Sequence, residues 1–219
     1  VRARWLREHH QVPARASGPW IQFAQPLLNS DQLKKQRQCW GKTLLVVLAH
    51  SWDQVDRSMD RKACVDAVKT LAEERNYQQV VWLRHWKDPE FLPLPKHWIS
   101  ACNGHRSNPW FLDALRTLLE LCDGVASNAF GTHLGYAAAL NKQLHWIDVA
   151  AEQNLSHLSS DKAAEEDAEW QERQRLSTAL QEALCMPPSR QQHAVQTVVE
   201  PYWGLSLKPT PADVKSWLI

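Results

Sequence analysis

The chain has 219 residues, of which 44% are hydrophobic, with 25 Lys and Arg against 24 Asp and Glu. These values are typical of a globular domain that is large enough to bury a core. The net charge of +1 argues against a nucleic-acid-binding groove over the whole surface and against an acidic disordered tail, but it allows a small local basic patch.

The five cysteines are odd in number and form no CxxC pair. They favour a reduced, cytoplasmic protein over a disulfide framework, and their spacing gives no zinc signature. The N-terminal stretch carries charges where a signal peptide would be apolar. The longest uncharged run, residues 124–141, contains polar residues and three glycines. We therefore expect no transmembrane segment and no metal.

Residues 1–39 have no sustained hydrophobic period and are interrupted by prolines and glycine. They are predicted to form an irregular arm with a short helix over residues 31–37. The sequence from residue 42 is more regular, because apolar runs of strand length alternate with helical segments. The predicted strands cover residues 43–49, 79–84, 98–102, 125–127 and 143–147. The predicted helices between them cover residues 61–75, 108–122 and 133–140.

This alternation indicates βαβ units and a parallel sheet. The expected fold class is α/β, a Rossmann-like doubly wound parallel sheet of about five strands. Asn108 as N-cap and Pro109 as first helical residue are the start signal of the second helix. A helical extension is expected over residues 155–219, with one helix at 161–184, a break at Pro187-Pro188 and a last helix opening at Thr210-Pro211.

Ligands of an open α/β sheet bind outside the carboxyl ends of the strands. Four polar segments follow predicted strands here, and short loops at strand ends would converge on one cleft. The candidate binding residues are His50, Ser51, Arg84, His85, Gly104, His105, Ser127, Asn128, Gly131, Thr132 and His133.

The segment after the fourth strand is the one best suited to phosphate. A helix that starts at Thr132-His133 offers free N–H groups and a partial positive charge, and Gly131 permits close approach of a ligand. The alternative is a plain strand-to-helix turn in which Thr132 is the N-cap. The segment matches neither GxGxxG nor a Walker loop.

The other segments also have two interpretations. Arg84 would pair with a phosphate, or with Asp88 or Glu90. His50-Ser51 and Gly104-His105 would contact a ligand, or would only form turns. The tryptophans near these loops would stack on a base or a sugar ring, or would pack in the core; they are Trp52, Trp86 and Trp110. No local Ser-His-Asp or Cys-His signature identifies a catalytic residue.

Several motifs together resemble a known group of proteins. They are the stretch 40–46, His50-Ser51, Gly104-His105, Phe111-Leu112 and the SN-x-x-GTHxGY stretch that starts at Ser127. Over roughly residues 38–150 the chain is similar to little-characterised bacterial proteins associated with surface polysaccharide synthesis. Those proteins resemble the C-terminal, nucleotide-sugar-binding half of GT-B glycosyltransferases.

This resemblance implies that residues 40–219 form a donor-binding half-domain and that residues 1–39 are a linker remnant. The activity, if present, would be glycosyl transfer, with an N-terminal GT-B domain or a partner chain supplying the acceptor side. It further implies that the turn residues from Ser127 to His133 hold the donor phosphates, with no cofactor beyond the nucleotide sugar and no nucleic acid as partner. One departure is that the residues after the turn, 134–137, lack the Glu that grips the ribose in GT-B enzymes.

Two alternatives remain open. The first is a non-catalytic Rossmann-like interaction module, which the missing Glu favours. The second is a nucleoside deoxyribosyltransferase-like enzyme, because such domains carry a similar GT…GYAxAxxK stretch. Their catalytic Glu falls where this chain has His133 and Leu134.

Overall fold

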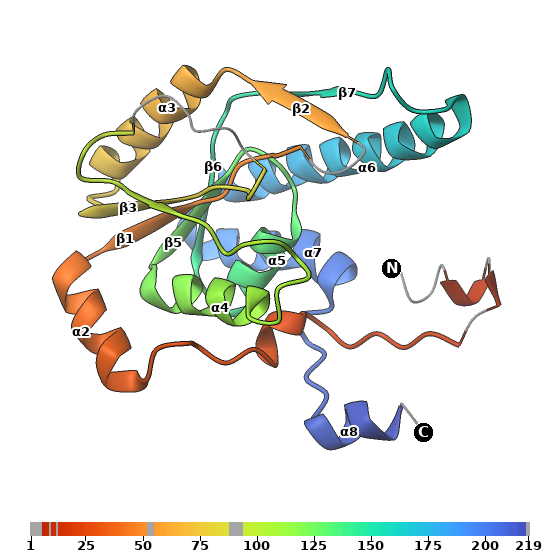
Figure 1. The fold of residues 1–219 in the computed structure, drawn as a ribbon, viewed down its shortest axis with the longest axis horizontal. Helices are drawn as coiled ribbons and strands as arrows, with labels where there is room; N and C mark the ends of the chain where they lie inside the picture. Colours follow the sequence, from red (N-terminus) through yellow and green to blue (C-terminus); the bar gives the residue numbers. More distant parts are fainter. Residues whose placement is uncertain (1–5, 9, 12, 52–54, 88–93, 218–219) are drawn as a thin grey trace.

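A computed structural model describes residues 6–8, 10–11, 13–51, 55–87 and 94–217. Within these residues the centre of the fold is a five-stranded sheet in which every neighbouring pair of strands is parallel. Its strands are β1 (Thr43–Val46), β3 (Gln79–Leu83), β4 (Ile99–Ala101), β5 (Gly124–Ser127) and β6 (Gln143–Trp146). Helices flank the sheet (Figure 1), so the predicted Rossmann-like α/β class is confirmed.

The strand order is β4-β3-β1-β5-β6. The chain moves outward from β1 to β3 and β4, and then returns to the other side of β1 for β5 and β6. The direction of winding therefore reverses between β1 and β5. In open α/β sheets the ligand crevice lies at this reversal, outside the carboxyl ends of the strands.

The central strands of the sheet are buried on both faces, since every residue of β1 and of β5 is buried. One face is covered by α3 (Arg61–Glu74), which inserts Val68 beside Leu44 and Val46. The opposite face is covered by α4 (Phe111–Leu121) and α5 (Thr132–Ala139) (Figure 1). These two cores enclose the sheet from its two sides.

The start of α4 differs from the expectation. The helix begins at Phe111, with Trp110 as N-cap, so the predicted start at Asn108-Pro109 is wrong. The carboxamide of Asn108 instead accepts a hydrogen bond from the backbone N of Trp110 at 3.0 Å. Asn108 thus caps a separate turn that precedes the helix.

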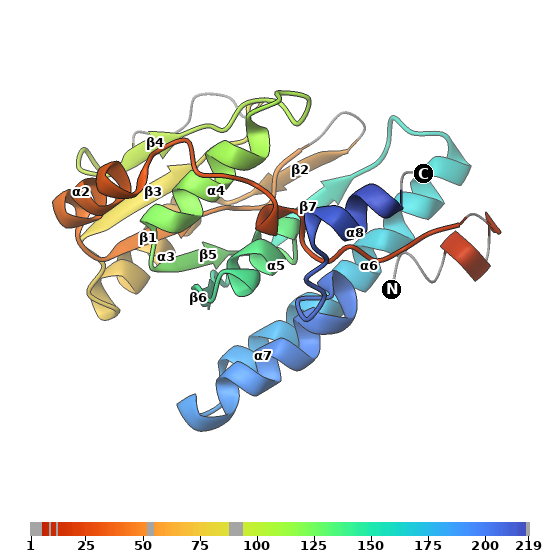
Figure 2. The ribbon, with the colours of Figure 1, turned by 90° about the horizontal axis from the view of Figure 1, so that it is seen from below.

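The C-terminal extension contains α6 (Ser160–Leu184), α7 (Pro188–Trp203) and α8 (Pro211–Ser216). The break at Pro187-Pro188 is only the corner between two helices, because Pro188 occupies the first turn of α7. Figure 2 shows α6 and α7 lying side by side. The end of α7 packs on α5, where the indole of Trp203 stacks on Phe130 at 4.5 Å.

Two further elements lie in the N-terminal segment. A short 3-10 helix, η1 (Trp20–Gln22), buries Ile21 in the core beside α4 and α5. Helix α2 (Ser30–Trp40) is longer than the helix expected over residues 31–37, and Asn29 and Gln32 close its first turn as a capping box.

A ribbon of two antiparallel strands, β2 (Asp56–Met59) and β7 (Ala151–Asn154), was not expected from the sequence. Along the chain, β2 is the next element after β1, and β7 is the next element after β6. Figure 1 shows the ribbon beside the first half of α6. None of the helices in the described ranges is long and apolar enough to cross a bilayer. All five cysteines are free thiols.

Candidate functional site

Three of the predicted loops meet at the carboxyl edge of the sheet through a row of aromatic rings. His50, which follows β1, stacks on His85, which follows β3, with ring centroids 4.3 Å apart. Trp86 contacts His85 at 5.8 Å and lies edge-on to His105, which follows β4, at 4.9 Å. We call His50, His85, Trp86 and His105 the ring row. The sequence predicted that these side chains lie at one edge of the sheet, because each follows a strand. The ring row shows that they are also in contact with one another.

Arg84 lies next to the ring row at the end of β3. Its backbone N donates to the carbonyl of Ala101 at 2.9 Å, which extends the pairing of β3 with β4. Its side-chain Nε is buried and has no acceptor in the described part of the chain. Asp88 and Glu90, the alternative partners, lie outside the described residues. A buried N–H without an acceptor is costly, so this group is suited to a ligand oxygen.

The turn before α5 is closed by Ser127 and His133. The imidazole Nε2 of His133 lies 2.8 Å from the hydroxyl of Ser127, which also accepts from the backbone N of Ala129 at 3.2 Å. Part of the His133 surface stays exposed, but its ring is densely surrounded. This burial, with a smaller effect of His50, lowers the pKa of His133 to about 3. His133 is therefore neutral at physiological pH and brings no positive charge to a phosphate.

Gly131, not Thr132, is the N-cap of α5, and no side chain caps the helix. A Cβ on Gly131 would lie 2.7 Å from Cε1 of His133, so the absence of a side chain lets the imidazole fold back over the turn. The exposed Thr132 begins the helix. The first amides of α5 thus remain free of side-chain caps and keep their partial positive charge.

Asn128 joins three strands at their carboxyl ends. Its Oδ1 accepts from the backbone N of Ala49, after β1, at 2.8 Å. Its Nδ2 donates to the carbonyl of Val149, after β6, at 3.0 Å. Asn128 is buried, so its amide links the segments that follow β1 and β6 at the switch point.

The remaining candidates lie in loops with defined hydrogen bonds. The hydroxyl of Ser51 accepts from the backbone N of Arg57 at 2.9 Å, and this bond ties the loop after β1 to β2. Gly104 adopts φ +78°, a conformation that glycine allows at little cost. His105 Nδ1 accepts from the backbone N of Ser107 at 3.1 Å, so this bond occupies one of the two ring nitrogens.

The tryptophans divide into two groups. Trp82 is buried in the core, and Trp146 packs against the core, as expected for strand residues. Trp86 and Trp110 are 43% and 61% exposed, so these two indoles are open to a stacking partner. Trp52 lies outside the described residues.

A polar cluster on the β2–β7 ribbon was missed by the sequence reasoning. The guanidinium of Arg57 lies 4.6 Å from the ring of Trp170 and donates to Oε1 of Gln153 at 3.2 Å. Arg57 Nε and Gln153 Nε2 are buried without a hydrogen-bond partner among the described residues. Burial, followed by the charge of Arg173, lowers the pKa of Arg57 to about 10. No local signal predicts this cluster, because its members come from β2, β7 and α6.

In the ranges that the structure describes, no three His, Cys, Asp or Glu side chains are grouped to hold a metal ion. Comparisons with protein-family models, with curated proteins and with solved structures find no match for this chain. The class of this protein is defined by its fold and by the side chains at the carboxyl edge of its sheet. It is a Rossmann-like α/β domain with imidazole, indole and guanidinium groups at that edge.

Proposed function

We propose that the chain binds a nucleotide sugar at the carboxyl edge, as the donor-binding domain of a glycosyltransferase-like protein of surface polysaccharide synthesis. The observation that carries this proposal is the ring row, which spans the ends of β1, β3 and β4 beside the Nε of Arg84, a buried donor that has no acceptor among the described residues. This combination suits a ligand that has both an anionic group and a flat or ring-shaped group.

The diphosphate would lie across the end of β1. Arg84 would bind it from the β3 side, and the uncapped amides of α5 would bind it from the β5 side. Neighbouring strands lie roughly 5 Å apart, so β3 and β5 are about 10 Å apart, a span that a nucleoside diphosphate bridges. Since His133 is neutral, the phosphate charge is met by Arg84 and by the helix dipole.

The base or the sugar would stack on an exposed indole in or near the ring row. Trp86 is the better placed of the two exposed tryptophans, because it touches both His85 and His105. The residues 134–137 offer no carboxylate for the ribose, so the stacking contact would carry more of the nucleoside recognition than it does in GT-B enzymes.

Calorimetric titration with UDP, CDP, GDP and CMP tests the proposal. We expect one of these nucleotides to bind, and Arg84→Gln to weaken its binding at least about tenfold, because a hydrogen bond to a charged partner is lost. Arg190→Gln removes an equal charge from an exposed position on α7 and serves as the matched control. The proposal fails if none of the four nucleotides binds at millimolar concentration.

These titrations and an assay of base exchange separate the two alternatives. A non-catalytic interaction module predicts that no nucleotide binds, or that binding is indifferent to Arg84. A deoxyribosyltransferase-like enzyme predicts base exchange between deoxynucleosides. The structure gives that second alternative no added support, because His133, at the position of the missing Glu, turns toward Ser127.

A further inference from the structure

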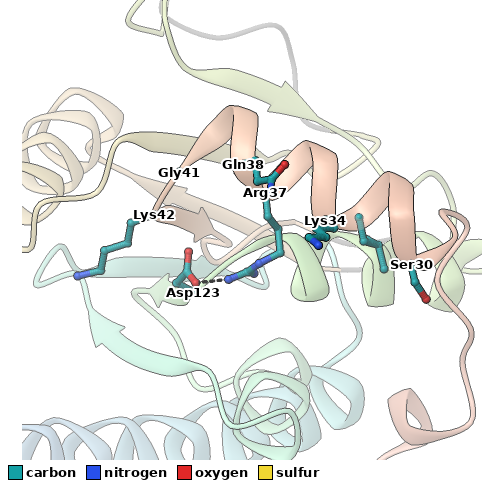
Figure 3. A pocket seen from close by; sticks show the side chains of 8 residues that line it. Ser30, Lys34, Arg37, Gln38, Gly41, Lys42 and Asp123 are labelled. Atoms are coloured by element: carbon teal, nitrogen blue, oxygen red, sulfur yellow. Dashed lines mark hydrogen bonds and ion pairs between the residues drawn. The ribbon is translucent and has the colours of Figure 1, made fainter.

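An open groove of about 640 Å³ lies beside α2 and the start of β1, but three of its charged side chains are engaged by the protein. Figure 3 shows Arg37 and Asp123 turned toward one another, and the guanidinium of Arg37 donates to Oδ1 of Asp123. The other oxygen of Asp123 accepts from the backbone N of Thr43 at 2.8 Å. Lys42 points away from this pair and donates to the carbonyl of Arg75 at 2.7 Å. These charged groups therefore find their partners within the protein.

The cluster of Arg57, Gln153 and Trp170, between the β2–β7 ribbon and α6, differs because two of its donors lack acceptors. Arg57 Nε and Gln153 Nε2 are both buried and have no hydrogen-bond partner among the described residues. The two side chains meet at their ends, since Arg57 Nη2 donates to Gln153 Oε1 at 3.2 Å. A buried N–H without an acceptor is costly, so two of them on neighbouring groups indicate that an acceptor is missing from this cluster.

The shape of the guanidinium suits an acceptor that has two oxygens. Nε and Nη2 lie on the same side of a guanidinium and form the fork that binds a carboxylate. Gln153 Oε1 takes a bond from Nη2, whereas Nε is left over. The guanidinium carbon lies 4.6 Å from the centre of the Trp170 ring, a contact that holds the fork in place. A carboxylate oxygen between Arg57 Nε and Gln153 Nε2 would satisfy both donors.

The charges around Arg57 leave a place for one negative charge. Burial, followed by the charge of Arg173, lowers the pKa of Arg57 to about 10, so the side chain stays protonated at neutral pH. Arg173 itself is paired with Glu169. Glu166 favours the charged form of Arg57, but these two side chains form no ion pair in the described structure, and burial raises the pKa of Glu166. One carboxylate would give the guanidinium a bonded counterion.

The cluster lies where a small group can reach it. Arg57, Gln153 and Trp170 are each partly exposed. Within the described residues, β2 pairs as a strand only with β7. A ribbon of two strands is marginally stable by itself, so a change of side-chain rotamer between the ribbon and α6 can admit a group as small as a carboxylate.

The geometry points to a binding site for the carboxylate of a small-molecule ligand, formed by the Arg57 fork and the carboxamide of Gln153. One oxygen accepts from Arg57 Nε and from Gln153 Nε2, and the other lies toward the Nη2 side of the fork. The site is built from the ribbon and α6, so it uses neither the ring row nor Arg84 and does not depend on the proposed nucleotide binding.

Proton–nitrogen NMR of the full chain, titrated with potassium acetate, tests this proposal. We expect the Nε–H signal of Arg57 and the carboxamide signals of Gln153 to shift with acetate, but not with potassium chloride at the same concentration. Arg57→Lys keeps the charge but removes the fork, so acetate binding followed at Gln153 should weaken at least about fivefold. Arg175→Lys makes the same change at an exposed position of α6 and should leave binding unchanged.

Two further variants keep the test decisive if Arg57→Lys disturbs the ribbon. Glu166→Gln removes a competing carboxylate and should tighten acetate binding about twofold to threefold. Arg84→Gln, at the nucleotide site, should leave it unchanged. The proposal is overturned if acetate shifts neither signal, if chloride shifts both equally, or if Arg84→Gln abolishes the effect of acetate. An Arg57 signal that responds to Glu166→Gln but not to acetate would also overturn it, because Glu166 would then be the acceptor.

Discussion

The imidazoles of His50 and His85 stack with their ring centroids 4.3 Å apart and their planes 14° from parallel. This contact couples the loop that leaves β1 to the loop that leaves β3. Through Trp86, the same row reaches His105 after β4. Side chains that follow three strands are thus already in contact without a ligand, and such preorganisation reduces the entropy lost on binding.

Because His85 contacts both His50 and Trp86, we expect its substitution to lower nucleotide affinity more than it lowers the free energy of unfolding. We expect His85→Ala to weaken nucleotide binding about fivefold while lowering the free energy of unfolding by less than about 1 kcal/mol, because the ring row lies at the edge of the core. Calorimetry and urea unfolding measure the two effects. His193→Ala, an exposed position on α7, is the control. A fall in stability without a change in affinity would show that the row is purely structural.

The buried amide of Asn128 should be important for folding. Asn128→Ala leaves the backbone N of Ala49 and the carbonyl of Val149 without their partners. Each lost bond to a buried group costs about 1 to 3 kcal/mol, and we expect a total of about 2 to 4 kcal/mol. Urea unfolding measures it, with Asn108→Ala at an exposed turn as the control. A cost below about 1 kcal/mol for Asn128→Ala would contradict this role.

Stability should fall in mildly acidic solution because of two histidines. Burial is the main cause that lowers the pKa of His133 to about 3 and the pKa of His145 to about 4. Below pH about 6.5 the unfolded chain therefore binds protons that the folded chain does not. The stability contribution is complete above pH 6.5 and is lost as the pH falls toward 4, by up to about 1.4 kcal/mol per pH unit for each histidine.

The urea midpoint at pH about 7.5 and about 5 measures this dependence. His145→Gln should flatten it, since His145 is buried and its Nε2 lies 2.8 Å from the hydroxyl of Tyr77. The exposed His193→Gln should leave the dependence intact. Equal midpoints at the two pH values in the wild-type chain would rule out the proposed charge state of both histidines.

Gly135 should tolerate no side chain. A Cβ at this position would lie 2.2 Å from Cδ2 of Trp203. We expect Gly135→Ala to destabilise the chain by about 1 to 3 kcal/mol, although alanine alone would favour the helix by about 1 kcal/mol. In a Trp203→Leu background the same change should cost less. The difference between the two backgrounds, measured by thermal unfolding, reports the contact directly, and no difference would contradict it.

The sheet was predictable because its central strands are continuous apolar runs of strand length that alternate with helical segments. The run around Leu44 and Val46 is β1, and the run at residues 79–84 contains β3. The β2–β7 ribbon escaped prediction because its sequences, DRSM and AEQN, are polar and half-exposed. Helix α7 escaped it because Pro187-Pro188 was interpreted as a break, whereas Pro188 opens the helix.

The candidate site was predictable in location but not in the role of each residue. The strand-end rule selected Asn128 and His133 as ligand-binding residues, yet both form hydrogen bonds within the protein. Asn128 bonds to the backbone of Ala49 and Val149, and His133 lies within hydrogen-bond distance of Ser127. These roles depend on tertiary distances that no local pattern encodes. The burial of Arg84 Nε, without an acceptor in the described part of the chain, is likewise visible only once β3 is placed between β1 and β4.

The location of the nucleotide is the point on which the proposed function depends most. Amide hydrogen exchange, with and without the nucleoside diphosphate that binds most tightly, measures it along the chain. We predict slower exchange at residues 84–86 and 127–134, at the carboxyl edge, and unchanged exchange at residues 30–42, which contain α2 and lead into the amino end of β1. Slower exchange at residues 30–42 with none at the carboxyl edge would contradict the proposal.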